Sequence, residues 1–404
     1  MKNIYLLILP LIFIFGCKDA EPDAREFPII LTSSPTDVDE TGATFQGELI
    51  TEGKLPTTSY GFVWGIKDQI VESANKISID SNPGTSKFTI RIDHALAKDV
   101  EYKIRAFATN SNTTVYGNTI SFISKGSSQN GWTIVDSVIN IGNPFFSFSD
   151  NESGYTIYQS SKMDRFDPGT KKFTSTINYP FIIYDYDNLT TAVSGNVLYG
   201  LINGYNLYKF INEKWVFRSG FNSQYQQPFS GYCQSLSVNN NIYFLSSRES
   251  FAYDLNFDTW QTKARLPIDG GYSNAGTTLN GKAYVITSDK NLWEYDPATD
   301  KWSLKSQYPG TLGERLAAFS YNNKLYFGIS SNVHVANQLV DKRLWSYDLT
   351  SNKWLTMEEF PSDHTYGSLF YFFLKNNLYV GMLNGGIGNN YTLWKYDPSK
   401  TSGF

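Results

Sequence analysis

Short stretches in which apolar and polar residues alternate, each bounded by turn residues, recur along most of this 404-residue chain. In Ala43–Leu49 and in Lys87–Ile92 every second side chain is apolar or small. A period of two predicts strands, because successive side chains of a strand point to opposite faces of a sheet. Aromatic residues, which pack well on a half-buried sheet, make up 16% of the chain. The pattern therefore predicts an all-β protein.

Residues 27–124 are predicted to form the first folded unit. The alternation is clearest where Tyr102, Ile104, Ala106 and Ala108 share one face. A leucine six residues before that tyrosine, followed by an Arg-Ala-x-Ala-x-Asn run, resembles the fibronectin type III family. The resemblance implies a β-sandwich, a unit that usually serves as a spacer or docking module. We expect His94 to be a solvated side chain. Residues 125–131, with Gly, Ser, Gln and Asn, are predicted to be a linker.

From residue 132 onward the chain repeats itself: an Asn- or Gly-rich turn precedes an apolar strand that contains a tyrosine. These tyrosines recur 41–53 residues apart, at Tyr199, Tyr243, Tyr284, Tyr326 and Tyr379. In each copy a second aromatic residue follows, and in five copies a third stands seven positions after it. The pairs are Phe166 and Phe173, Tyr208 and Trp215, Tyr253 and Trp260, Tyr295 and Trp302, and Tyr347 and Trp354. The intervening Asp- and Pro-containing segments are predicted to be tight turns.

These motifs resemble the Kelch repeat, which implies that each copy forms one four-stranded blade of a β-propeller. The chain departs from the family in lacking most of the Gly-Gly doublets that end the second Kelch strand; only Gly328 and Gly381 stand near that place. Five copies supply their own outer strand, whereas the copy around Tyr396 does not. The strand at Trp132 resembles the outer strand around Trp302. We therefore predict a six-bladed propeller over residues 132–404, closed by the strand at Trp132.

The N-terminus has the pattern of a signal peptide that is removed during export. The apolar run Ile4–Phe15 is short for a bilayer span, which needs about 20 residues. Residues 1–17 end in Gly16-Cys17, which resembles the lipobox of bacterial lipoproteins and implies that Cys17 carries the lipid anchor. Residues 18–26 form an acidic tether like the signal that exports lipoproteins to the cell surface in one Gram-negative phylum. The expectation is an outer-membrane lipoprotein; the alternative is an ordinary signal peptide with an incidental cysteine.

The charge and the cysteine content exclude further classes of protein. The net charge is −4 and no Lys- or Arg-rich cluster occurs, which argues against a nucleic-acid partner. The two cysteines are Cys17 and Cys233. If the first is lipidated, no disulfide framework is possible, and the second is expected to be a small buried side chain.

Candidate binding residues lie in the loops that enter the innermost strands, which meet over the central funnel of a propeller. They are Tyr184, Tyr186, Tyr225, Tyr232, Tyr272, Arg315, His364 and Tyr366. Tyrosine offers an apolar face with a polar tip, which suits sugar rings or extended peptides. The alternative is that these side chains fill the funnel mouth and pack the blades together.

Templates for catalysis fit poorly. The chain has no Gly-x-Ser-x-Gly elbow, phosphate loop or His-Glu-x-x-His run, and its three histidines exclude a His-rich metal centre. Copper oxidases with Kelch-like propellers use two histidines, tyrosines and a thioether cysteine. The spacing of His334, His364 and Cys233 does not support such a copper site. We expect no cofactor and no metal. The favoured function is a non-catalytic surface module that binds a glycan or docks onto an outer-membrane protein complex. A sugar-modifying enzyme of the Kelch mutarotase type remains open, and a charged pair facing the funnel would favour it.

Overall fold

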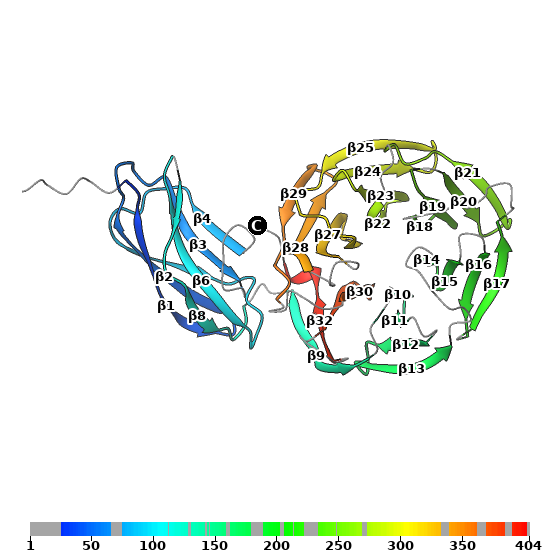
Figure 1. Cartoon of the computed structure of the whole chain (residues 1–404), viewed down its shortest axis with the longest axis horizontal. Coiled ribbons are helices and arrows are strands. Elements are labelled where there is room, and N and C mark those ends of the chain that lie inside the picture. The colour runs from blue at the N-terminus through cyan, green and yellow to red at the C-terminus, as the bar shows by residue number, and fades with distance from the viewer. Residues whose placement is uncertain are drawn as a thin grey trace, which may run out of the picture.

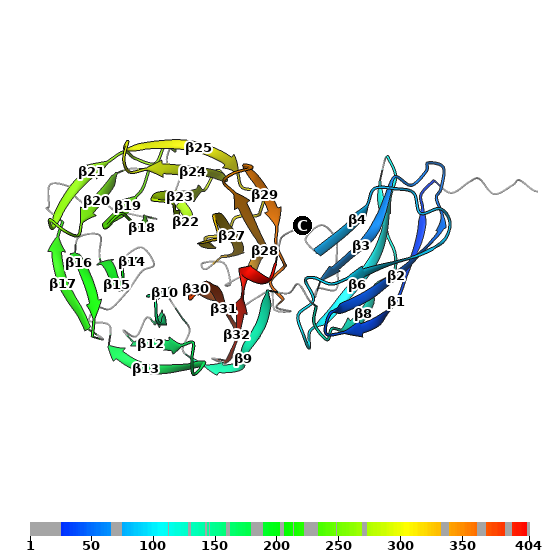
Figure 2. The same cartoon turned by 180° about the vertical axis from the view of Figure 1, so that it is seen from behind.

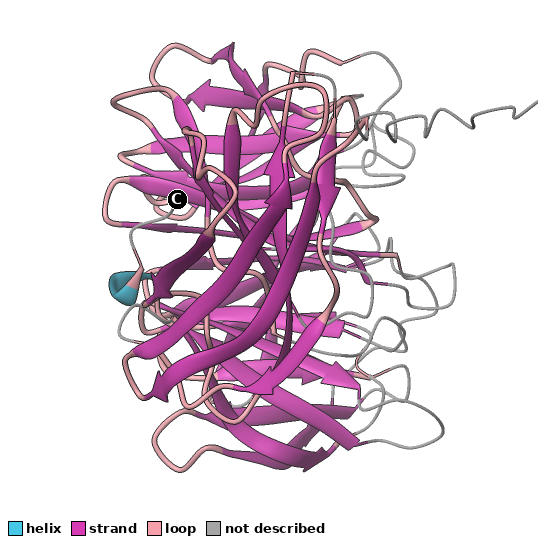
Figure 3. Cartoon of the chain, turned by 90° about the vertical axis from the view of Figure 1, so that its left-hand side faces the viewer, coloured by secondary structure: helices cyan, strands magenta, loops and turns pink. Residues whose placement is uncertain are grey.

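Strands dominate the computed structural model, which confirms the all-β prediction (Figure 3). Residues 26–65, 75–111, 113–127, 131–141, 144, 146–158, 162–178, 189–202, 206–212, 214–221, 233–247, 249–268, 273–332, 339–361, 369–383 and 390–401 are described. Within this part of the chain the helical structure is one 3-10 turn, η2 (Pro398–Lys400).

The N-terminal region is a sandwich of two antiparallel sheets. One sheet has the order β1-β2-β5, and the other has the order β4-β3-β6-β7, with β8 also paired to β6. The strands are β1 (Ile29–Asp39), β2 (Gly42–Thr51), β3 (Ser59–Gly65), β4 (Asn75–Ile79), β5 (Lys87–Ile92), β6 (Glu101–Thr109), β7 (Thr114–Tyr116) and β8 (Ile120–Ile123).

The core of the sandwich follows the alternation of the sequence. Every apolar residue of the Tyr102–Ala108 face is at most 4% exposed, as the alternation predicts. Phe45 packs edge-on against Phe62 and Trp64 from the opposite sheet. His94 corrects an expectation, because its side chain is 15% exposed and packs edge-on against Trp64 with ring centroids 5.4 Å apart. It also contacts the Asp93 carboxylate at 3.1 Å.

Six four-stranded antiparallel sheets follow the sandwich in the described chain, arranged around a ring like the blades of a β-propeller (Figures 1 and 2). We number them first to sixth, and their innermost strands are β10, β14, β18, β22, β26 and β30. The first sheet comprises β10 (Phe146–Ser149), β11 (Gly154–Ile157), β12 (Lys162–Asp167) and β13 (Lys172–Asn178). The second comprises β14 (Leu189–Ser194), β15 (Val197–Ile202), β16 (Asn206–Ile211) and β17 (Lys214–Gly220). The third comprises β18 (Gln234–Val238), β19 (Asn241–Leu245), β20 (Ser250–Asp254) and β21 (Thr259–Lys263).

The remaining sheets continue the same order along the chain. The fourth comprises β22 (Ser273–Leu279), β23 (Lys282–Thr287), β24 (Asn291–Asp296) and β25 (Lys301–Gln307). The fifth comprises β26 (Arg315–Tyr321), β27 (Lys324–Ser331), β28 (Leu339–Asp348) and β29 (Lys353–Thr356). The sixth comprises β30 (Leu369–Leu374), β31 (Asn377–Leu383), β32 (Asn390–Tyr396) and, as its outer strand, β9 (Trp132–Asn140).

The Asn- and Gly-rich turns join the two inner strands of a sheet. Asn280 and Gly281 have φ angles of 52° and 74°, and Asn322 and Asn323 have φ angles of 45° and 59°. Two successive positive φ angles match the twist of a two-residue hairpin, and Asn and Gly adopt them at low cost. This explains why such residues precede each apolar strand of the repeat.

The spacing of seven residues reflects the register of the two outer strands. Tyr295 lies opposite Trp302, with ring centroids 5.0 Å apart, and the tyrosine hydroxyl donates to Asp300 in the intervening turn at 2.6 Å. The Trp302 indole N–H donates across to the Ala264 carbonyl of the preceding sheet at 3.0 Å. The pair of Tyr295 and Trp302 therefore joins two strands of its own sheet and ties that sheet to its neighbour.

The second sheet departs from this spacing. Trp215 lies opposite Phe210, and Tyr208 lies opposite Phe217. Tyr208 and Trp215 therefore do not lie opposite each other, although they are seven positions apart. The hairpin is two residues shorter than in the third, fourth and fifth sheets.

The strand at Trp132 occupies the outer position of the sixth sheet. Trp132 lies opposite Tyr396, with ring centroids 4.9 Å apart. This is the arrangement of Tyr253 with Trp260 in the third sheet, also at 4.9 Å. The first and sixth sheets are neighbours, because the Ser147 hydroxyl donates to the Tyr371 carbonyl at 2.9 Å.

Candidate functional site

The repeated topology defines one edge of the ring at which the candidate loops would enter. Each innermost strand begins there and the second strand of the same sheet ends there, as where Arg315 lies opposite Ser331 and Gln234 lies opposite Leu245. We call this edge the mouth. The segments that join one sheet to the next reach the innermost strands at the mouth, so residues far apart in sequence approach the same edge.

Arg315 is the first residue of β26 and is half-buried at the mouth. Its charge acts on Tyr371 of the neighbouring innermost strand, β30. Burial raises the pKa of Tyr371 to about 12, and the Arg315 charge opposes that shift. The Tyr371 hydroxyl donates to the Leu316 carbonyl at 2.7 Å. Arg315 and Tyr371 thus lie where the fifth and sixth sheets meet, and Tyr371 was not among the candidates because it reads as one aromatic residue within an apolar strand.

The other candidates fall in segments that are not described. These are Tyr184, Tyr186, Tyr225, Tyr232, Tyr272, His364 and Tyr366, together with the lipidation candidate Cys17. Of the candidates, Arg315 is the one that the structure places.

A charged network that the sequence analysis missed lies at the mouth of the fifth sheet. Asp341 near the start of β28 accepts hydrogen bonds from the Arg343 Nε and Nη2 atoms, each at 3.0 Å, and from the Thr311 backbone N–H at 2.9 Å. The Asp341 side chain is 3% exposed and that of Arg343 is 24% exposed. The hydrogen bonds that Arg343 donates to Asp341 raise the pKa of Arg343 further. The sequence signal was an Asp-Lys-Arg run at the start of an otherwise apolar strand.

This pair does not resemble the acid and base of an enzyme. Both Asp341 oxygens accept hydrogen bonds, so a proton transfer would break a buried, charge-assisted pair. The pair instead holds the segment between β25 and β26 against the fifth sheet, where the Ser330 hydroxyl also donates to the Thr311 carbonyl at 2.7 Å. These contacts fix the position of that segment at the mouth.

A second polar cluster lies where the first and sixth sheets meet. Asp164 stands in β12 at the position that tryptophan occupies in the fourth and fifth sheets, and it is 8% exposed. The Tyr158 hydroxyl donates to Asp164 at 2.7 Å and lies 2.9 Å from the Thr156 hydroxyl. Burial raises the pKa of Tyr158, which keeps this hydroxyl a donor. The cluster satisfies its own polar groups.

Cys233 precedes β18 at the mouth and packs partly buried against the core between the second and third sheets. Burial raises the pKa of its thiol, which disfavours the nucleophilic thiolate. Among the described residues no group of three or more His, Cys, Asp or Glu side chains is placed to hold a metal ion. The described part of the chain also contains no helix long and apolar enough to cross a membrane.

Comparisons with known proteins give a coarse result. No family model and no curated protein matches the chain. Solved structures of β-propeller proteins do match. The "Structure of YjhT" is 17% identical, with 48% of this chain and 72% of that chain covered and a TM-score of 0.37. "YCF48 bound to D1 peptide" is 10% identical, with 67% and 83% covered and a TM-score of 0.40. The "Crystal structure of Nidogen/Laminin Complex" is 11% identical, with 63% and 90% covered and a TM-score of 0.38. Because these TM-scores are all below 0.5, the fold is described from the strand pairing of this chain and not from these neighbours.

Proposed function

We propose that this protein is a lipid-anchored surface protein whose fibronectin type III-like sandwich holds a six-bladed, Kelch-type propeller closed by β9. The ring is a non-catalytic module that captures a glycan or docks onto an outer-membrane protein complex through its mouth. The anchor is the lipid on Cys17.

The observation that carries this proposal is the direction in which the sandwich runs. Glu40, which directly follows β1, lies beside Gly126, where the chain leaves the sandwich for the ring. The start of β1 therefore lies at the opposite end of the sandwich. A strand of 11 residues spans roughly 35 Å. An N-terminal anchor would thus hold the ring about that far from its attachment point, as a surface-exposed docking module requires.

The described chemistry of the mouth supports binding over catalysis. Its charged pair, Asp341 with Arg343, is engaged in holding a loop, and the Cys233 thiol has a raised pKa. A module that recognises its ligand by shape and aromatic contact needs neither a perturbed acid nor a nucleophile.

Anchoring is tested by labelling cells with a clickable palmitate analogue. The unaltered protein should incorporate the label and sediment with the outer membrane, whereas Cys17→Ala should do neither. Cys233→Ala is the matched control and should label normally. Equal labelling of the Cys17→Ala variant would contradict lipidation at this residue.

The binding role is tested by comparing Tyr225→Ala, Tyr272→Ala and Tyr366→Ala for thermal stability and for retention on glycans or membrane partners. Loss of retention with an unchanged melting temperature supports a binding mouth. If the tyrosine side chains instead fill the mouth as buried core residues, each substitution should cost about 3–5 kcal/mol of stability and cause no specific binding defect. Acceleration of sugar anomer exchange, followed by NMR, would instead support the mutarotase alternative.

A further inference from the structure

One buried carboxylate lies where the sandwich, the linker and the ring meet. Glu358 follows β29 and is 1% exposed. The Gly131 backbone N–H donates to its Oε2 atom at 2.8 Å and to its Oε1 atom at 3.1 Å. The backbone N–H groups of Trp132 and Ala95 also act on this carboxyl group as hydrogen-bond donors, which favours its charged form and lowers its pKa. Among the described residues Glu358 forms no ion pair, so backbone N–H groups supply its polar contacts.

The three donors belong to three different parts of the molecule. Ala95 lies in the sandwich, in the segment between β5 and β6. Gly131 ends the linker, and Trp132 is the first residue of β9, the outer strand of the sixth sheet. Glu358 itself lies just after β29, the outer strand of the fifth sheet. One side chain therefore joins the sandwich, the chain that leads from it, and two neighbouring sheets of the ring.

The sandwich segment around Ala95 is built into both cores. Leu96 is buried in the core of the sandwich, whereas Ala97 packs with Trp132 and Phe360 in the core between the fifth and sixth sheets. Val100 packs against both cores. The sandwich and the ring thus share part of a hydrophobic core. Separating them would expose this apolar surface to water, which is unfavourable.

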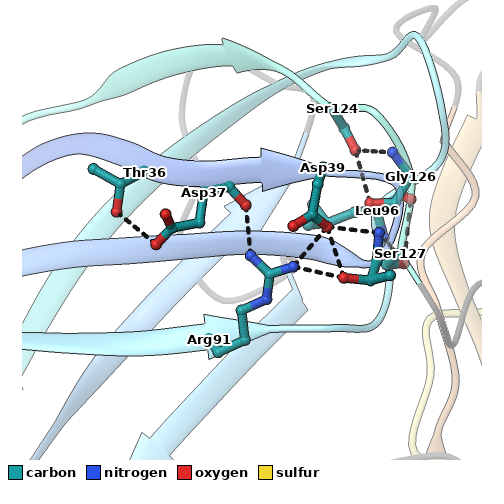
Figure 4. Close-up of polar contacts among 9 residues, drawn as sticks. Thr36, Asp37, Asp39, Arg91, Leu96, Ser124, Gly126 and Ser127 are labelled. Carbon is teal, nitrogen blue, oxygen red and sulfur yellow. Dashed lines mark hydrogen bonds and ion pairs between the residues drawn. The ribbon is translucent and has the colours of Figure 1, made fainter.

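Ala95 and the start of the linker are held in place from the sandwich side. Ala95 has a φ angle of 53°, and its carbonyl accepts a hydrogen bond from the Trp64 indole at 3.1 Å. The Ser127 hydroxyl exchanges hydrogen bonds with the backbone N–H and carbonyl of Leu96, each at 3.2 Å (Figure 4). The Ala95 N–H is therefore aimed at the ring by the sandwich's own contacts.

A second polar contact crosses the same junction without touching β9. Asn75, at the start of β4, accepts a hydrogen bond from the Glu359 backbone N–H at 3.3 Å and is 5% exposed. This contact offers a way to loosen the sandwich alone.

We propose that Glu358 couples docking of the sandwich to pairing of β9 with the sixth sheet, so that the sandwich acts as a clamp on the strand that closes the ring. If the sandwich undocks, Glu358 loses one donor and the cores open to water beside Trp132. If β9 detaches, Glu358 loses two donors and remains buried with fewer partners. Because a buried carboxyl group with few hydrogen bonds is unfavourable in either protonation state, each event promotes the other. This role does not depend on what the mouth binds.

Hydrogen exchange measured by mass spectrometry on the full chain tests the coupling. Asn75→Ala removes a contact of the sandwich and none of β9. We expect it to raise exchange both in residues 93–100 and in β9. Glu358→Ala should raise exchange in both segments by about tenfold or more, because it leaves buried N–H groups without an acceptor. Glu358→Gln, which keeps an acceptor oxygen, should have a smaller effect and covers the case in which the alanine variant fails to fold.

Glu294→Gln is the matched control, because Glu294 is a mostly buried acid of the fourth sheet that pairs with Lys282. It should leave exchange in residues 93–100 and in β9 unchanged. If Asn75→Ala raises exchange in the sandwich but not in β9, the coupling is refuted. The same holds if the Glu358 variants affect Gly131 and Trp132 while residues 93–100 stay protected. These measurements involve no ligand, so they do not bear on the binding proposal.

Discussion

The outer strands of the fourth and sixth sheets reach the same local geometry by different routes. In the fourth sheet β25 follows β24 through a short turn, and Tyr295 packs against Trp302 at 5.0 Å. In the sixth sheet β9 comes from the other end of the ring-forming chain, yet Tyr396 packs against Trp132 at 4.9 Å. The Tyr396 hydroxyl even lies 2.7 Å from Thr401, the position that matches Asp300.

The difference lies in what holds the outer strand near its partner. A covalent turn keeps β25 close to β24 even when the sheet opens, so re-pairing carries little loss of chain entropy. Pairing of β9 must instead close a loop that contains nearly the whole ring. A further contact holds β9 at this point: the Gly131 N–H donates to the buried Glu358, whereas Lys301, the counterpart of Gly131, is exposed. Identical packing therefore need not mean identical cooperativity.

The largest expected effect comes from removing the two equivalent tryptophans. Trp132 is 1% exposed, so Trp132→Ala should cost about 3–5 kcal/mol, as loss of a large buried aromatic side chain does, whereas Trp302 is only partly buried and Trp302→Ala should cost less. Trp132→Ala should in addition raise hydrogen exchange across the first, fifth and sixth sheets, because it frees the outer strand. Trp302→Ala should raise exchange in the third and fourth sheets. If each variant raised hydrogen exchange only in its own sheet and to the same extent, the way the outer strand is connected to the chain would have no effect on cooperativity.

Glycine at position 131 gives a second contrast. A Cβ atom there would lie 2.5 Å from the Tyr396 Cε2 atom, so Gly131→Ala forces the Trp132 strand away from its partner. We expect a loss of about 1–3 kcal/mol, measured by denaturant unfolding. Lys301 is the counterpart before Trp302, and it is exposed. Lys301→Ala should be nearly neutral, and a comparable loss there would contradict this explanation.

The pH dependence of stability should single out the sixth sheet. Burial raises the pKa of Glu358 from 4.5 to about 8, against the opposing effect of its N–H donors. Tyr102 from β6 and Tyr396 from β32 face it, with Glu359 and Asp397 acting on the same tyrosines. Because the folded state binds this proton more tightly, the contribution is greatest below pH 4.5 and is lost as the pH rises through 8.

The melting temperature should therefore fall between pH 5 and pH 8.5, and Glu358→Gln should flatten that fall. Glu294 serves as the control, because the Lys282 side chain is among the groups that hold its pKa below the usual value. Glu294→Gln should leave the slope over this range unchanged. An unaltered slope in the Glu358→Gln variant would mean that this carboxyl does not titrate there.

Much of the fold follows from the sequence because it depends on local spacing. The turn at Asn280-Gly281 and the pairing of Tyr295 with Trp302 follow from residues within a few positions of one another. The position of β9 was predicted because Trp132 carries the same local signature. Tyr208 and Trp215 keep the spacing of seven residues without lying opposite each other, and the sequence does not reveal this because a register shift of two residues leaves every side chain on the same face.

The junction could not be predicted in the same way. Glu358 lies in a Met-Glu-Glu-Phe segment, and this local sequence does not indicate that one glutamate is buried against backbone N–H groups. His94 likewise packs against Trp64 only because the sandwich brings two distant segments together. Such contacts depend on tertiary proximity and have no sequence period.

The smallest expected effect concerns the hydroxyl partners of the two tyrosines. Asp300 accepts from the Tyr295 hydroxyl at 2.6 Å and from the Ala264 backbone N–H at 2.9 Å. Within the described part of the chain, the Thr401 hydroxyl has the Tyr396 hydroxyl as its one hydrogen-bond partner. With about 1 kcal/mol for a typical hydrogen bond, Thr401→Ala should cost about 1 kcal/mol and Asp300→Ala roughly twice that. Thr401→Ser, which keeps the hydroxyl, is the control and should retain most of the stability. If Thr401→Ala costs as much as Asp300→Ala in denaturant unfolding, residues beyond η2 contribute more to the outer edge of the sixth sheet than this hydroxyl alone.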